Sequence, residues 1–301
     1  MIDDPLWPRA DGWLASGSAS PDLAVVGVPT SSASLSPSEA WRMPGAFREV
    51  LGRFSTWDSE DRVDIGGLAV TDLGDWAVDA LDMHGVLEGV ADLARALDGA
   101  AIHAFVGGDN AITRPLVRGL FPGHLERVGV LTLDAHHDVR SLDNGPTNGT
   151  PIRGLIEDGL PGRNVTQVGI HSFANSGDYR HYCEEQGIEV ITMAAIDEVG
   201  AGWLVSTALD DLAERCDRIF VDVDMDVLDV AFAPGCPGAR PGGMMPRQLA
   251  AACRAAGSHT AVVAVDFVEA DPTRDPSGAT TMQVVNAFLA FCSGLAQRRS
   301  S

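Results

Sequence analysis

The sequence has no run of about 18 consecutive apolar residues, the length that a membrane-spanning helix requires. Its N-terminus, MIDDPLWPRADGWL, is acidic and lacks the basic and apolar segments of a signal peptide. We therefore expect a cytoplasmic protein without a membrane partner.

Cysteines and basic residues are also scarce. The five cysteines are odd in number, irregular in spacing and form no CxxC pair, which argues against a disulfide framework and a zinc knuckle. Only 21 basic residues oppose 42 acidic ones, so the net charge is −21. Nucleic acid is therefore not expected as a partner, because its phosphates require a cationic surface. An anionic small-molecule substrate would need local arginines to overcome this field.

Apolar, β-rich segments alternate with segments long enough for helices, such as 78–99 and 202–216. Continuous apolar strands separated by helices predict an α/β fold with a parallel sheet covered on both faces. We expect one domain over residues 1–301, with loose ends at 1–20 and 295–301. The eight strand candidates are 23–29, 68–75, 103–109, 129–136, 165–171, 189–193, 218–226 and 261–270.

Four of these strand candidates end in polar motifs, GGDN, DAHHD, DVDMD and VEAD. In open parallel sheets, ligands bind beyond the carboxyl ends of the strands. A strand that continued to His136 would point Asp134 and His136 to the same side, and Asp138 could turn back toward them. A second strand repeats this spacing with Asp222, Asp224 and Asp226.

Carboxylates that converge at strand ends repel one another unless a cation neutralises them. An oxygen-rich set with one imidazole suits Mn²⁺ or a similar divalent ion better than a thiolate set would. Two such ions that share carboxylates would convert a water between them into a hydroxide. His137 would face away from His136, so we expect it to pack or to support the site.

These motifs resemble the ureohydrolase superfamily, the metal-dependent arginase and agmatinase group. The resemblance covers about residues 23 to 290 and rests on GGDNAITRP, DAHHDVR, NGTPIRGLIE, DVDMDVLDVAFAPGCPGARPGG and VEADPTRD. It implies a three-layer α/β sandwich around an eight-stranded, mainly parallel sheet. It also implies a binuclear Mn²⁺ centre. A homo-oligomer is a further expectation, because members often form trimers or hexamers.

The resemblance implies six metal-ligand positions. Asn110 occupies a position that is His in most members, and an amide oxygen is a weaker ligand than an imidazole. Loss of even a supporting partner typically costs ~10–100-fold in metal affinity, so we expect the outer metal position to be weak or vacant. The bridging ligands would be Asp134 and Asp224, the deeper site would add His136 and Asp226, and the outer site would add Asp138 and Asn110.

Within the superfamily, NGTP, DMDVLD, PGCP and VGIHSFANS are similar to formimidoylglutamases. These enzymes hydrolyse N-formimidoyl-L-glutamate to L-glutamate and formamide in histidine degradation. The resemblance implies that a metal-bridging hydroxide attacks the amidine carbon while Asp138 moves a proton to the leaving amine. Glu269 would pair with the cationic nitrogens of the substrate.

The two carboxylates of such a substrate require cationic or polar partners. Arg140 and Arg153 are the candidate clamps, since a guanidinium matches a carboxylate bidentately. Asn148 is either a turn residue or a hydrogen-bond donor to a substrate carboxylate. Arg180 and Arg240 are more remote candidates.

Two alternatives stay open at this point. An agmatinase or another guanidino-acid hydrolase would release urea in place of formamide. A metal-poor homologue with a binding role would release neither, and only Asn110 favours it.

Overall fold

A computed structural model describes residues 4–78, 80–97 and 101–298. Its main sheet has eight strands in the order β4-β1-β5-β10-β9-β6-β7-β8, and all neighbouring strands are parallel. These strands coincide with the eight candidates from the sequence, which confirms the predicted sheet. Their bounds are β1 (Leu23–Val28), β4 (Val70–Asp75), β5 (Ile102–Gly107), β6 (Val128–Leu133), β7 (Val165–Ile170), β8 (Glu189–Thr192), β9 (Arg218–Asp224) and β10 (Val262–Val268).

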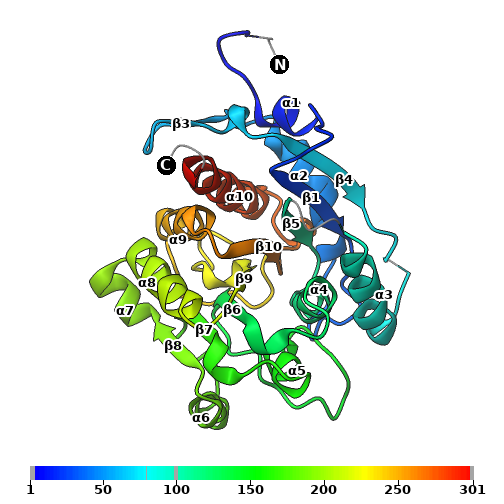
Figure 1. The fold of residues 1–301 in the computed structure, drawn as a ribbon, viewed down its shortest axis with the longest axis vertical. Coiled ribbons are helices and arrows are strands. Elements are labelled where there is room, and N and C mark those ends of the chain that lie inside the picture. Colours follow the sequence, from blue (N-terminus) through cyan, green and yellow to red (C-terminus); the bar gives the residue numbers. More distant parts are fainter. Residues whose placement is uncertain (1–3, 79, 98–100, 299–301) are drawn as a thin grey trace.

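Helices cover both faces of this sheet and complete the predicted three layers (Figure 1). The predicted helical segments 78–99 and 202–216 contain or overlap α3 and α8. One face is covered by α1 (Ala10–Leu14), α2 (Met43–Leu51), α7 (Met193–Val199), α8 (Ala201–Ala213), α9 (Pro246–Ser258) and α10 (Ala279–Arg298). The other is covered by α3 (Met83–Arg95), α4 (Thr113–Leu120), α5 (Pro151–Glu157) and α6 (Gly177–Gln186).

The six inner strands read as largely apolar runs because both of their faces are buried, whereas the edge strands β4 and β8 are partly exposed. In β1, Val25 packs into the core under α2 and α10, while its neighbour Val26 packs into the core under α3 and α4. In β9, Val221 and Phe220 divide between the two cores in the same way. Successive side chains of a strand point to opposite faces, so each face needs its own apolar set.

The prediction that both ends of the chain are loose is wrong for the described residues that lie in α1 and α10. In α1, Trp13 is buried and donates from Nε1 to the carbonyl of Leu68 at 3.1 Å. At the other end, α10 continues to Arg298 and Leu295 is buried. These segments pack because their apolar side chains reach the core. Residues 1–3 and 299–301 lie outside the described residues.

One short antiparallel pair, β2 (Trp57–Asp58) and β3 (Val63–Asp64), was not predicted from the sequence. Two residues per strand are too few to show an alternating pattern. By length and composition α10 could cross a membrane, yet 67% of its apolar window is buried inside the protein. Its apolar character is therefore accounted for by packing against α9 and α2.

Candidate metal centre and substrate cavity

Four adjacent strands at the centre of the sheet end at one edge, and each leads into a predicted polar motif. In sheet order these strands are β5, β10, β9 and β6. The chain passes from β5 to β6 although β10 and β9 lie between them, which creates a switch point of the kind where ligands bind. The motif residues at these ends are Asn110, Glu269, the Asp224 and Asp226 pair, and the Asp134, His136 and Asp138 set.

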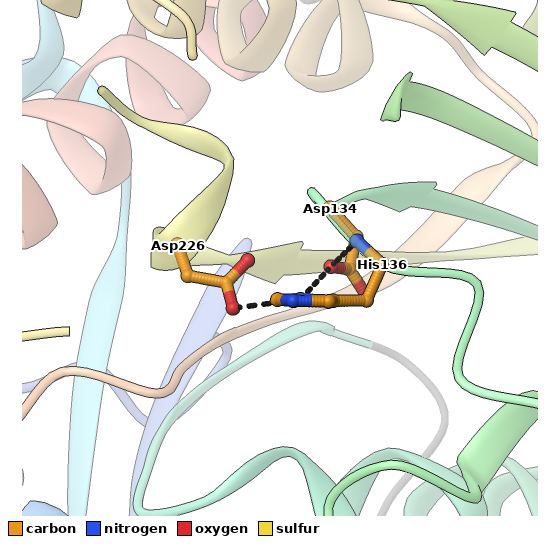
Figure 2. A group of neighbouring side chains, drawn as sticks. All are labelled: Asp134, His136 and Asp226. Atoms are coloured by element: carbon orange, nitrogen blue, oxygen red, sulfur yellow. Dashed lines mark hydrogen bonds and ion pairs between the residues drawn. The ribbon is translucent and has the colours of Figure 1, made fainter. Parts of the chain in front are cut away.

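The first ligand group contains Asp134, His136 and Asp226, whose ligand atoms lie within 4.8 Å of one another. Nδ1 of His136 is 3.0 Å from Oδ2 of Asp226 and 3.5 Å from Oδ1 of Asp134, and Figure 2 shows the imidazole between the two carboxylates. Burial by itself would lower the pKa of His136, but the charges of Asp226 and Asp134 raise it to about 12. This group therefore stabilises positive charge at its centre.

Asp134 also belongs to a second group, with Asp138 and Asp224, whose ligand atoms likewise lie within 4.8 Å. All three carboxylates are buried. Burial and repulsion from neighbouring carboxylates raise the pKa of Asp138 and of Asp224 well above the ordinary aspartate range. A divalent cation would offset this cost, and carboxylates with one imidazole are suitable donors for it. The donor set fits two metal positions that share Asp134.

The backbone that brings these ligands together has a different conformation from the one predicted. Strand β6 ends at Leu133, so Asp134 and His136 lie in the loop beyond it and not on a common strand face. The loop is held by a 2.6 Å hydrogen bond from the amide of His136 to Oδ1 of Asp134. Asp138 adopts a left-handed φ of 52°, which turns it back toward the other ligands, as expected.

Asn110 lies against the second group, but its amide nitrogen faces the carboxylates. Nδ2 donates to Oδ2 of Asp138 at 2.7 Å and to Oδ2 of Asp224 at 3.3 Å, while Oδ1 accepts from the hydroxyl of Thr113 at 2.7 Å. In this orientation the amide of Asn110 is a hydrogen-bond donor to two carboxylates of the second group. To serve as a metal ligand, the amide must rotate so that Oδ1 replaces Nδ2.

Glu269 closes the site from the end of β10. It has a left-handed φ of 66° and is only 4% exposed. Its Oε1 accepts from the backbone amide of Asn110 at 2.8 Å and from Nδ2 of Asn148 at 2.9 Å. Burial and the charge of Asp109 raise the pKa of Glu269 to about 8, against the effect of these two donors. A bound cation would therefore strongly stabilise the charged form of this carboxylate.

The two ligand groups form the floor of a cavity of about 300 Å³. Its walls come from loops after several strands, and two arginines, Arg140 and Arg240, reach it. Neither arginine forms an ion pair with any carboxylate of the described residues. The other lining residues are Leu35, Ser36, His136, Asp138, Asn148, Gly149, Ala174, Asn175, Ser176, Tyr179, Asp224, Asp226, Pro237, Gly238 and Glu269.

Two predicted substrate residues, Arg153 and Asn148, make contacts that differ from those expected. Arg153 does not line the cavity, because it pairs with Glu157 at 3.0 Å and its guanidinium lies 4.1 Å from the ring centre of Tyr182. We therefore withdraw Arg153 as a carboxylate clamp. Asn148 does line the cavity, but both polar atoms of its amide already bond to the protein.

Sequence reasoning ranked Arg240 behind Arg140 and Arg153, and it missed Thr113. Arg240 enters the cavity from the GARPGG loop, and its Nη1 donates to the carbonyls of Gly238 and Ala239. The adjacent PGCP motif was the only signal that could have indicated it. Thr113, three residues after Asn110 in ITRP, lies behind the amide that it orients. The three-residue spacing between Asn110 and Thr113 was visible in the sequence, but the hydrogen bond between their side chains was not.

Several polar residues lie next to the two ligand groups without belonging to them, and they contact other parts of the protein. His137 bonds through Nδ1 to Oε1 of Gln167 at 2.6 Å, which confirms its supporting position. His171 bonds to the carbonyl of Val227 at 3.0 Å. Asp222, the first acid of DVDMD, lies in β9 directly beside Asp266 of β10, one layer below the ligands.

Fold and site together define a class: α/β proteins whose parallel sheet carries two adjoining divalent-metal ligand groups under a small cavity. The Arginase family profile matches residues 21–293. The formimidoylglutamase of Halalkalibacterium halodurans is 37% identical over 277 residues, which cover 90% of this chain and 86% of that protein. The guanidinopropionase of Pseudomonas aeruginosa is 35% identical over 228 residues, 74% of this chain and 69% of that protein.

A solved structure agrees with these relatives. The formimidoylglutamase of Bacillus subtilis superposes with a TM-score of 0.90 at 30% identity, covering 98% of this chain and 94% of the other. The chain belongs to the arginase family. It is accordingly a hydrolase, and its family chemistry is the hydrolysis of amidine groups in small molecules.

Proposed function

We propose that this protein hydrolyses N-formimidoyl-L-glutamate to L-glutamate and formamide, with Mn²⁺ in the two ligand groups. The observation that carries the proposal is the pair of arginines without carboxylate partners, Arg140 and Arg240, in the wall of an otherwise acidic cavity. In a protein of net charge −21, cations left free beside a metal centre favour a substrate with more than one carboxylate.

The reactive end of this substrate fits the acidic end of the cavity. A formimidoyl group is planar and cationic, and Glu269 would hold its nitrogens through charge-assisted hydrogen bonds. Asp134, His136, Asp138, Asp224 and Asp226 would hold the metals, with Asn110 as a weak sixth ligand. Metal ions in such a site lower the pKa of a bound water and so supply the nucleophile.

The remaining step is the departure of the amine. Water oxygen bonds to the formimidoyl carbon, the bond from that carbon to the glutamate nitrogen breaks, and a proton passes to this nitrogen. Asp138 would make this transfer, a role supported by its position in the cavity lining and in the second ligand group. The products are then formamide and L-glutamate, and no other reactant is consumed.

The two arginines in the cavity wall disfavour agmatine as the substrate. Agmatine carries a second cation and no carboxylate, so it would place positive charge near two arginines. A guanidino acid with one carboxylate is a closer competitor, and its hydrolysis would release urea. Family membership and relatives that are enzymes do not favour a non-catalytic role.

A side-by-side assay with added Mn²⁺ tests this function. N-formimidoyl-L-glutamate, agmatine, arginine and 3-guanidinopropionate are each supplied, and formamide and urea are quantified. We expect formamide from the first substrate with the highest kcat/KM of the panel. Urea release from any guanidino compound with a higher kcat/KM would overturn the assignment.

A further inference from the structure

The side chain of Asn148 connects two parts of the cavity that are far apart in the sequence. Its Oδ1 accepts from the backbone amide of Leu35 at 2.9 Å. Its Nδ2 donates to Oε1 of Glu269 at 2.9 Å. One N–H of Nδ2 and one lone pair of Oδ1 are therefore engaged with the protein itself, and these two contacts set the orientation of the amide.

The loop that Asn148 reaches depends on hydrogen bonds for its position. Leu35 lines the cavity with 52% of its surface exposed, so apolar packing contributes little to holding it. One acceptor fixes the preceding residues: Oδ2 of Asp109 accepts from the amide of Ala33 at 3.1 Å and from the hydroxyl of Ser34 at 3.0 Å. Asn148 adds the bond to Leu35 and a 3.0 Å bond from its own amide to the carbonyl of Ala33.

Glu269 likewise depends on few partners. It is buried on a left-handed backbone, and among the described residues it accepts hydrogen bonds only at Oε1, from the amide of Asn110 and from Asn148. Both bonds end on the same oxygen, so Oε2 stays available for a ligand. The orientation of this carboxylate is therefore set by one backbone donor and one side-chain donor.

We propose that Asn148 is a positioning residue: it fixes the carboxylate of Glu269 and couples it to the cavity loop at Leu35, in place of binding substrate itself. The claim about catalysis rests on the proposed function, in which Glu269 holds the amidine. An amide meets the needs of this position because one of its atoms accepts and the other donates. An aspartate would keep the bond from Leu35 but set a second carboxylate against Glu269.

Two variants separate the two contacts. Asn148→Ala removes both of them, whereas Asn148→Asp keeps the acceptor for Leu35 and removes the donor to Glu269. Asn144, on the same loop with an exposed side chain, provides the matched controls Asn144→Ala and Asn144→Asp.

Hydrogen exchange of the full-length protein tests the loop contact without substrate. We expect faster exchange of the Leu35 amide in Asn148→Ala, and wild-type exchange in Asn148→Asp and in both Asn144 controls. Unchanged exchange in Asn148→Ala, or equal acceleration in both Asn148 variants, would overturn the coupling.

Steady-state kinetics with saturating Mn²⁺ test the contact with Glu269. Both Asn148 variants should lose kcat by about 10–100-fold, the usual effect of removing a supporting hydrogen bond, with KM little changed. The same loss should occur with N-butylformamidine, which has no carboxylate. A higher KM for N-formimidoyl-L-glutamate alone, with N-butylformamidine unaffected, would show that Asn148 binds the substrate carboxylate and would overturn the proposal.

These measurements also distinguish the two proposals. If no variant and no wild-type protein releases formamide, the proposed function fails. The exchange experiment still decides whether Asn148 positions the loop, because it needs neither substrate nor turnover.

Discussion

Single residues at the metal groups have unequal roles. Asp134 belongs to both ligand groups, whereas Asp226 belongs to the first and Asp224 to the second. The family resemblance implied that Asp134 and Asp224 would both bridge two metals, whereas the two ligand groups share Asp134 alone. The DxD spacing in the sequence does not distinguish these roles, because they depend on how the ends of β6 and β9 bring the side chains together.

This difference predicts a graded loss of metal. Asp134→Ala should abolish activity and bind neither metal ion tightly, because it removes a ligand from both groups. Asp226→Ala should impair chiefly the position beside His136. Metal content per chain, measured after equilibrium dialysis against Mn²⁺, distinguishes the two variants. Equal metal content in both would contradict the shared role of Asp134.

A substitution at Gly149 provides a second test at the level of a single residue. A Cβ atom there would lie 2.6 Å from Cδ of Arg140 and 3.1 Å from Cδ1 of Leu35, so both flexible side chains would have to move. Gly149→Ala should raise KM for N-formimidoyl-L-glutamate on the order of tenfold, since small misplacements of binding groups are costly. The melting temperature should change little.

Gly45→Ala is the matched control for that variant, because a Cβ at Gly45 meets nothing within 4 Å. It should leave KM unchanged. A KM for Gly149→Ala equal to that of the wild type would argue that Arg140 has no part in substrate binding.

At the scale of elements, the sequence predicted the sheet and failed on the loops. Long apolar strands were recognised because both of their faces are buried, so their composition alone marks them. The site is built from loop conformations, such as the positive φ of Asp138 and of Glu269, which have no periodicity. For the same reason, proximity to NGTPI favoured Arg153, while Arg240 reaches the cavity from a loop distant in sequence.

The start of α10 shows how an element supports the site. Oδ2 of Asp275 accepts from the amide of Thr280 at 2.7 Å and from its hydroxyl at 2.8 Å, and that hydroxyl accepts from the amide of Gly235 at 2.9 Å. This contact fastens the PGCP loop to the helix. Burial would raise the pKa of Asp275, but donors from Ser277 and Thr280 lower it overall.

A carboxyl group whose pKa is lowered by folding stabilises the protein above its unfolded pKa of about 3.9, and this stabilisation is lost as pH falls through the folded value. Asp275→Asn should therefore cost about 1 kcal/mol of unfolding free energy at pH 7, as the loss of a helix cap does. The difference should shrink below about pH 4. Thermal unfolding of both proteins at pH 7 and pH 3 measures it. An equal difference at both values would exclude the carboxylate charge as its cause.

At the scale of the whole molecule, the net charge of −21 opposes the approach of an anionic substrate. Salt screens this long-range field, since the Debye length falls to about 10 Å at 0.1 M, while contacts inside the cavity are screened less. For N-formimidoyl-L-glutamate, kcat/KM should therefore rise a few-fold (roughly two to five) between low and moderate salt. N-butylformamidine, a cation, should show the opposite trend. A fall with salt for both substrates would contradict the field argument.

The most direct test of the central claim is the rate of formamide release from N-formimidoyl-L-glutamate, measured as the Mn²⁺ content per chain is raised. We expect fewer than two tightly held ions at first, because the amide oxygen of Asn110 is a weaker metal ligand than an imidazole. Activity should rise with added Mn²⁺, and Asn110→His should reach full activity at a lower Mn²⁺ concentration. Full activity in metal-free protein, or no formamide at any Mn²⁺ loading, would contradict the account.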